Sequence, residues 1–366
     1  MHKAVLALFF PVLAFGQINV GGTWRFIASS SIYGVVSTGN GTLTQNGSSV
    51  SAQFIFSGSP CATSGSGTGT LSGTSLTMNI NEGGQIVVFT GTVTSDGNSA
   101  SGNYQAPQGG CTQGDFGTFT GTRLPAIGTG GVVNGASFGT QSPAAGSIGS
   151  LFGTALASAT TAASAVPLPT SLGGVTVRLN GIAVPLFFVS AGQINFQFPW
   201  ELTGLTTATA TVTARGSTSS SQTVRLAAAG PGIFSINSQG SGQGAIQIAN
   251  TVIFAAPEGS IAGAQARPAK RSEFLTIYCT GLGDVDPRPA NGAGAPSNPV
   301  ANTKTKPTVT LGGVDAPVSF SGLTPGYVAL YQVNVQVPAN APSGAVVQLV
   351  VTIGSVASNT VTIAVE

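Results

Sequence analysis

The sequence contains little charge. Only 6% of its 366 residues are Asp, Glu, Lys or Arg, against about 25% in an average soluble protein. The 12 basic and 10 acidic residues almost cancel, and the basic ones form no long cluster. Binding to nucleic-acid phosphates or to anionic lipid needs several Lys or Arg side chains on one face. The composition therefore argues against a nucleic-acid partner and against electrostatic attachment to a membrane.

Histidine is scarcer still. The single histidine, His2, lies in the N-terminal segment that we expect to be removed. Serine and cysteine hydrolases usually activate their nucleophile with His, and zinc or copper sites commonly use imidazole. We therefore predict no metal site, no cofactor and no enzymatic activity. A hydrolase with two facing carboxylates stays open as an alternative, and Glu82 and Asp115 are the pair to test.

Long apolar runs are missing beyond the N-terminus. Residues 1–16, MHKAVLALFFPVLAFG, combine a basic start, a short apolar core and a small-x-small end, which is typical of a secretory signal. The run is too short for a membrane anchor, which needs roughly 18 apolar residues. We expect Gln17 to begin a mature chain that has no integral membrane segment and is secreted or held at the cell surface.

Glycine, serine and threonine are abundant in residues 17–124. The 53 glycines of the chain and frequent turn signals divide this region into short alternating segments. Asn46-Gly47 and Asp96-Gly97 supply the left-handed conformations that tight hairpins need. The pattern predicts about eight strands in up-and-down order, forming a barrel or a sandwich.

The first and last of these strands carry a further pattern. Gly22-Thr23-Trp24 lies on the first strand and Arg123 on the last. This arrangement resembles the lipocalin and avidin barrels. The resemblance implies that Arg123 packs over the indole of Trp24 and closes one end of the barrel, whereas a lone Trp in a β domain is more simply part of the core.

Three cysteines are present. Cys61 and Cys111 lie in loop-like stretches of the first region, and in an exported protein such a pair usually forms a disulfide. Closing about fifty residues, this bond is worth roughly 4 kcal/mol. Cys279 lies in an apolar strand and is expected to be a buried free thiol.

An internal repeat begins after residue 124. QINFQFP at 193–199 matches QVNVQVP at 332–338, and NGIAVPLFF at 180–188 matches GGVDAPVSF at 312–320. Matching motifs in the same order indicate two copies of one module. We predict two Ig-like sandwiches, residues 125–229 and 230–366.

The repeat resembles the immunoglobulin-like TIG modules. More closely, PGIF, GQGAI, RPAKRSEFLTIYCTGLG and YQVNVQVP resemble the uncharacterised C-terminal region of secreted acidobacterial proteins, over about residues 131–366. This resemblance implies a secreted, β-rich protein. It implies no particular activity.

The repeated strands alternate apolar and amide side chains. The apolar row is expected to face the core. The amide row is a candidate for contacts between modules or with a neighbouring loop, or for a polar ligand such as a glycan. It consists of Gln193, Asn195, Gln197, Gln332, Asn334 and Gln336.

Asp284 and Asp286 lie two residues apart in a turn and are a weak candidate for calcium. A good calcium site needs six or more oxygen ligands, so an ordinary turn is the simpler interpretation.

The sequence as a whole predicts an all-β protein, with an N-terminal β domain at 17–124 followed by two Ig-like modules. We expect a non-catalytic binding or structural protein that is adhesive, or that binds a polysaccharide or another cell-surface component through the N-terminal domain. The alternative is a small-ligand carrier with a lipocalin-like barrel.

Overall fold

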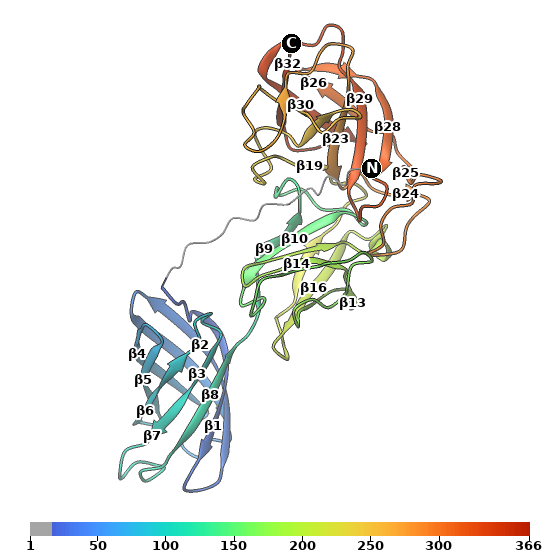
Figure 1. The fold of residues 1–366 in the computed structure, drawn as a ribbon. Coiled ribbons are helices and arrows are strands. Elements are labelled where there is room, and N and C mark those ends of the chain that lie inside the picture. The colour runs from blue at the N-terminus through green and yellow to red at the C-terminus, as the bar shows by residue number, and fades with distance from the viewer. Residues whose placement is uncertain (1–16) are drawn as a thin grey trace.

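Residues 17–366 are described by the computed structural model, and nearly all regular elements in this range are β-strands. A barrel is followed along the chain by two sandwiches, as Figure 1 shows. The prediction of an all-β fold is confirmed. The predicted secretory signal, residues 1–16, lies outside the described residues.

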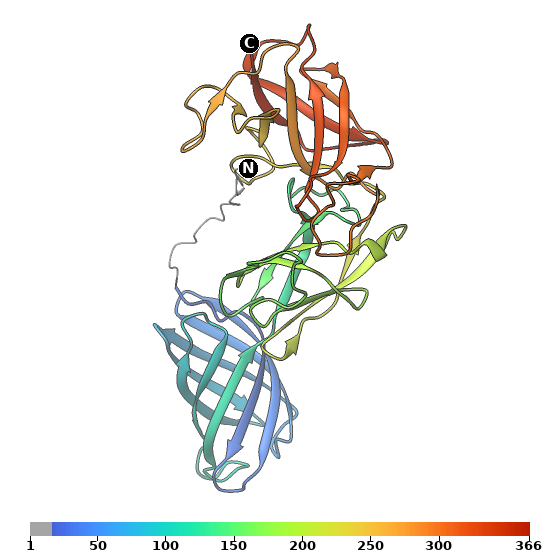
Figure 2. The same cartoon turned by 45° about the vertical axis from the view of Figure 1, so that its right-hand side comes forward.

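The N-terminal unit is a closed barrel of eight antiparallel strands, each paired with the next and the last paired with the first. Figure 2 shows these strands wrapping into a cylinder. The predicted up-and-down order is confirmed, and the closed form is a barrel and not a sandwich. The strands are β1 (Gly22–Ser30), β2 (Val36–Asn46), β3 (Ser49–Ser57), β4 (Ser64–Ser72), β5 (Ser75–Glu82), β6 (Gln85–Val93), β7 (Ser99–Gln105) and β8 (Phe116–Arg123).

Alternation of side chains explains the barrel. In β3, Val50, Ala52 and Phe54 are buried, and the residues between them are exposed. Ser and Thr supply much of the outer surface of these strands, so the barrel is solvated by hydroxyl groups with few charges. Successive side chains of a strand point to opposite faces, so this period of two places the apolar row inside.

The first sandwich, β9–β18, has two sheets that share one apolar core. The first sheet runs β11-β14-β15-β10-β9, with β9 (Ala126–Asn134), β10 (Ile148–Thr154), β11 (Thr161–Ala162), β14 (Leu186–Val189) and β15 (Gln193–Gln197). The second runs β13-β12-β16-β17, with β18 also on β16. Its strands are β12 (Thr176–Leu179), β13 (Ile182–Ala183), β16 (Thr207–Ala214), β17 (Ser217–Thr218) and β18 (Gln222–Arg225).

The second sandwich, β19–β32, is built in the same way around its own core. Its larger sheet contains β19 (Gly232–Ile233), β20 (Ile246–Ile248), β21 (Phe254–Ala255), β22 (Ala266–Arg267), β23 (Phe274–Thr280), β24 (Val285–Asp286), β25 (Asn302–Thr303), β28 (Val318–Leu323) and β29 (Tyr331–Gln336). Its smaller sheet contains β26 (Thr308–Leu311), β27 (Val314–Ala316), β30 (Gly344–Ile353), β31 (Val356–Ala357) and β32 (Val361–Val365).

The two sandwiches repeat one set of strand connections. Strand β15 lies between β14 and β10, and β29 lies between β28 and β23. The β14–β15 and β28–β29 pairings carry a bulge at the same point, between Leu186 and Phe188 in the first and between Val318 and Phe320 in the second. The matched sequence motifs thus occupy equivalent strands.

One hairpin turn in each sandwich has an equivalent conformation. Asn180-Gly181 joins β12 to β13 with φ angles of 49° and 81°, and Gly312-Gly313 joins β26 to β27 with 59° and 82°. Two successive positive φ angles are characteristic of a tight turn whose twist suits a hairpin. The correspondence between the two copies thus extends to this turn.

A tryptophan from the first sandwich joins the core of the second. Trp200 begins the short 3-10 helix η1 (Trp200–Leu202), and two residues separate it from the end of β15. It is 5% exposed and packs among residues of the second core. The guanidinium of Arg288 lies 5.3 Å from its ring centroid. The backbone N–H of Trp200 donates to Oδ1 of Asn291 at 3.0 Å. The two sandwiches therefore share a buried side chain.

The barrel is joined closely to the first sandwich. Only two residues separate β8 from β9. The Arg215 side chain donates from Nη2 to the carbonyl oxygens of Arg123 at 3.0 Å and Ala155 at 2.7 Å. One arginine thereby ties the last barrel strand to the first sandwich. No helix in the described range has the length and apolar character needed to cross a membrane.

The shared tryptophan leads to a prediction about unfolding. We expect the two sandwiches to unfold together, and Trp200→Ala to lower the free energy of unfolding by about 3–5 kcal/mol, since it removes a large buried side chain. It should also split the transition of the sandwiches into two, as followed by calorimetry. Trp24→Ala is the matched control, because it removes the same side chain from the barrel. An unsplit transition in Trp200→Ala would contradict the prediction.

Candidate functional site

The interior of the barrel is not completely filled. An inner cavity of about 70 Å³ lies among apolar side chains from several strands. The side chains that dominate its wall are Phe26, Phe54, Phe56, Met78, Phe89 and Phe119. This part of the barrel can receive only an apolar group.

Glycines on neighbouring strands make room for these rings. Phe54 lies opposite Gly41 in the β2–β3 pairing, and Phe26 lies opposite Gly121 in the β1–β8 pairing. A Cβ atom at Gly41 would come within 2.5 Å of the Phe54 ring, and one at Gly121 within 2.6 Å of the Phe26 ring. Each ring thus lies over the glycine of the neighbouring strand, and a larger residue at that position would collide with the ring.

An outer cavity of about 720 Å³ opens at one end of the barrel. It shares Ala28, Ser37, Phe56 and Phe89 with the inner cavity. Its other walls come from the last residues of β1, β5 and β7 and from the loops beside them. The two cavities therefore adjoin, the outer one at the mouth of the barrel and the inner one in its apolar interior.

The opposite end of the barrel is closed. Trp24 is 1% exposed and donates from Nε1 to the carbonyl oxygen of Val20 at 2.7 Å. Arg123 is its partner in the β1–β8 register and donates to the carbonyl oxygen of Asn19 at 3.0 Å. Burial lowers the pKa of Arg123, and the positive charge of the nearby Arg215 lowers it further. The predicted pair of Trp24 and Arg123 lies together at this end.

A buried carboxylate organises the open end. Asp115 is 5% exposed and lines the outer cavity. Its Oδ1 accepts from the Ser30 hydroxyl at 2.6 Å, and its Oδ2 accepts from the Tyr104 hydroxyl at 2.8 Å. Burial raises the pKa of Tyr104, and the hydrogen bond to Asp115 raises it further. The hydroxyl therefore keeps its proton and stays a donor. These contacts join the ends of β1, β7 and β8.

A second carboxylate and the disulfide lie at the same mouth. Glu82 lines the outer cavity and accepts a hydrogen bond from the Ser59 hydroxyl. Cys61 and Cys111 form the predicted disulfide, with Cα atoms 5.7 Å apart, and link the loop after β3 to the loop before β8. Glu82 and Asp115, the carboxylates singled out from the sequence, thus border one cavity.

The amide strand of the first sandwich is largely buried. Ile194, Phe196 and Phe198 are fully buried in the core, as expected. Oδ1 of Asn195 accepts from the Ser150 hydroxyl at 3.0 Å and from Gln193 at 2.9 Å.

Beyond this pair of bonds, the same strand reaches the second sandwich. Gln197 is 1% exposed, and its Oε1 accepts from the backbone N–H of Gly292 there at 2.6 Å. This strand contributes to the junction between the sandwiches.

The equivalent strand of the second sandwich is more open. Gln332 donates to Oδ1 of Asn334 at 2.9 Å, repeating the bond between Gln193 and Asn195. Gln336 instead donates to the carbonyl oxygen of Ser272 within its own sandwich, at 3.0 Å. The two copies therefore share an amide pair and differ in what their last glutamine contacts.

The carboxylate of Asp284 faces two cations. It forms ion pairs with Arg288 at 2.7 Å and with Lys304 at 2.8 Å. Asp286 lies in β24 and is exposed. Within residues 17–366, no group of three or more His, Cys, Asp and Glu side chains is arranged to hold a metal ion. The contacts of Asp284 are those of an ordinary ion-paired turn.

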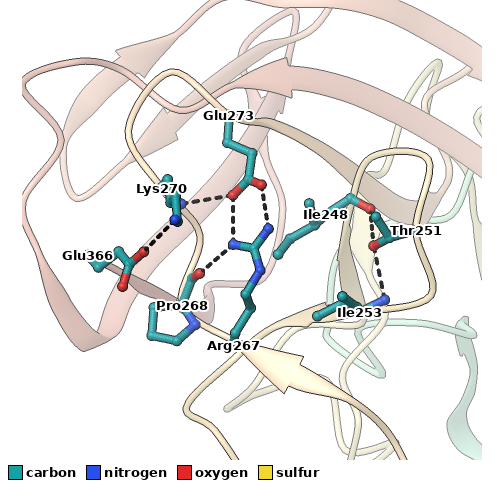
Figure 3. A network of polar contacts seen from close by, with 8 residues as sticks. All are labelled: Ile248, Thr251, Ile253, Arg267, Pro268, Lys270, Glu273 and Glu366. Carbon is teal, nitrogen blue, oxygen red and sulfur yellow. Dashed lines mark hydrogen bonds and ion pairs between the residues drawn. The ribbon is translucent and has the colours of Figure 1, made fainter.

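The basic segment at the start of β23 is also paired. Arg267 donates to both carboxylate oxygens of Glu273, at 2.5 and 3.0 Å, and Lys270 lies 3.8 Å from Glu366 (Figure 3). The first pair lies within the segment before β23, and the second links that segment to Glu366, the residue after β32. The third basic residue, Arg271, donates to the carbonyl oxygen of Ala341. Cys279 is buried, as expected.

Comparisons with known proteins give little detail. No family model matches the chain, and no curated protein matches it. A solved structure of the I9–I11 tandem from titin is 11% identical, covers 89% of this chain and 98% of its own, and gives a TM-score of 0.19. Domains 5–6 of the S-layer protein SbsC are 15% identical, with coverages of 66% and 98% and a TM-score of 0.21.

The two amide strands give a matched pair of substitutions. Asn195→Ala leaves the buried Ser150 hydroxyl without its acceptor, so we expect it to lower the free energy of unfolding by about 1–3 kcal/mol. Asn334→Ala removes only a half-buried contact and is expected to cost about 0.5 kcal/mol or less. Urea denaturation of both variants measures the difference. Equal small effects would show that Asn195 has no structural role.

Proposed function

We propose that the N-terminal barrel binds a small, largely apolar ligand, and that the protein is a secreted or surface-associated binding protein without catalytic activity. The observation that carries this proposal is the path from an open mouth to an apolar interior, closed at its far end by Trp24 and Arg123. An apolar cavity that is closed at one end can hold one small apolar molecule, which enters from the mouth.

The dimensions and lining of the cavity support this proposal. A volume of about 720 Å³ lies within the range of about 300–1,000 Å³ that is usual for small-molecule sites. Phenylalanine and methionine line the deep part, while hydroxyl and carboxylate groups gather at the mouth. A polysaccharide would need polar partners along its length, so this lining favours a small-ligand carrier over a polysaccharide-binding head.

Burial of apolar ligand surface in the barrel can supply enough free energy to bind a small ligand. Burying about 200 Å² of apolar ligand surface is worth about 5 kcal/mol before the costs of association. The barrel is closed by strand pairing all around and is stapled by the disulfide at its mouth. A preformed site loses little of this energy to reordering.

The rest of the chain supports the assignment to an exported binding protein. Disulfides persist mainly in oxidising compartments, and Cys61 and Cys111 are joined. The two sandwiches share Trp200 and hold the barrel through Arg215. We propose that they are a stiff support that presents the barrel, with its mouth at the end away from the sandwiches.

A pair of neighbouring substitutions tests the ligand site. The Ala28 side chain borders both cavities, and Ser29 is exposed on the outer surface of the same strand. Ala28→Phe should fill the path and weaken binding of the neutral probe N-phenylnaphthylamine at least about tenfold, whereas Ser29→Phe should not. Fluorescence titration of the full mature chain measures both. Absence of probe binding to the unsubstituted protein, or equal binding by both variants, would contradict the proposal.

A further inference from the structure

The charged groups that line the mouth of the barrel carry one sign. Glu82 and Asp115 border the outer cavity, and none of the described residues that line either cavity is Lys, Arg or His. The two arginines of the barrel lie elsewhere. Arg123 is at the closed end, and Arg25 is exposed on the outer surface. A charged ligand group at the mouth therefore meets carboxylates alone.

Asp115 is buried without a cation. Its two hydrogen bonds come from Ser30 and Tyr104, which are neutral donors. Two half-buried carboxylates of the second sandwich are treated differently, since Glu273 faces Arg267, and Asp284 faces Arg288 and Lys304. A carboxylate removed from water retains an electrostatic cost that a nearby cation offsets. At Asp115, the described part of the chain supplies no such cation.

Aromatic rings complete the surroundings of the mouth. Phe56, Phe89 and Tyr104 line the outer cavity, and the rings of Phe89 and Tyr104 stack with centroids 5.5 Å apart. The face of an aromatic ring attracts an ammonium group. Phe56 and Phe89 also line the inner cavity, so an apolar chain attached to that group can continue into the interior.

We propose that the ligand of the barrel is a cationic amphiphile, with an ammonium group at the mouth beside Asp115 and Glu82 and an apolar chain directed toward the inner cavity. This inference rests on the proposed function and narrows it to one ligand class. A fatty carboxylate of the same length fits the apolar path equally well, but its head group is repelled by two carboxylates.

Three probes with one chain length test the inference. Decylamine, decanol and decanoate each have ten carbons, and at neutral pH their head groups are a cationic ammonium, a neutral hydroxyl and an anionic carboxylate. Each is titrated against the full mature chain carrying N-phenylnaphthylamine, and displacement of the dye is measured. We expect decylamine to bind at least about tenfold more tightly than decanol, and decanoate to bind most weakly.

Substitutions at the mouth locate the preference. Asp115→Asn and Glu82→Gln should each bring the ratio of decylamine to decanol affinity closer to one. Glu258→Gln is the matched control, because it removes one exposed charge from the second sandwich and should leave the ratio unchanged. Circular dichroism checks that each variant is folded. If Asp115→Asn unfolds, Glu82→Gln decides the outcome.

The outcomes separate the two proposals. Equal binding of the three probes, or tighter binding of decanoate, overturns the cationic ligand and leaves the apolar carrier standing. A ratio that the mouth substitutions leave unchanged also overturns it. Failure of the dye and of all three probes to bind overturns both proposals.

Discussion

Closure of the barrel around its own aromatic rings is the constraint on which the rest of this structure depends. Eight strands enclose an interior just wide enough for side chains or for one small ligand. Phenylalanines on β1 and β3 lie across glycines of the neighbouring strands, as Phe26 does at Gly121 and Phe54 at Gly41. Because these rings lie against the wall, a small apolar cavity of about 70 Å³ remains between them.

The two ends of the barrel differ because their polar groups are satisfied differently. At the closed end, Trp24 and Arg123 donate to backbone carbonyls of the segment that precedes β1, and this segment covers the opening. At the mouth, hydroxyls of Ser30 and Tyr104 turn toward Asp115, so that the ends of the strands are joined at the rim. The interior thus stays accessible from one side only.

Much of the fold could be predicted from the sequence because it is encoded locally. Frequent turn signals indicated the barrel strands, and the repeated motifs QINFQFP and QVNVQVP indicated two equivalent strands in two copies of one fold. The cavity could not be predicted in this way. Its walls combine Ala28, Phe56, Tyr104 and Asp115, which are far apart in the sequence, and only closure of the barrel brings them together. Glu82 and Asp115 were singled out from the sequence as a pair of carboxylates that could face each other, but the sequence did not indicate where in the fold they would meet.

One difference between the two copies of the repeat indicates where the sandwiches contact each other. The first motif continues as FPWE and the second as VPAN, so the tryptophan has no counterpart in the second copy. In the structure, Trp200 enters the core of the neighbouring sandwich, and Gln197 just before it binds Gly292 across the same junction. A side chain that serves the fold of one module is expected in both copies. One that appears in a single copy serves what that copy alone does, which here is to join the next module. Departures from a repeat therefore locate contacts between modules, as agreement with it locates the core of each.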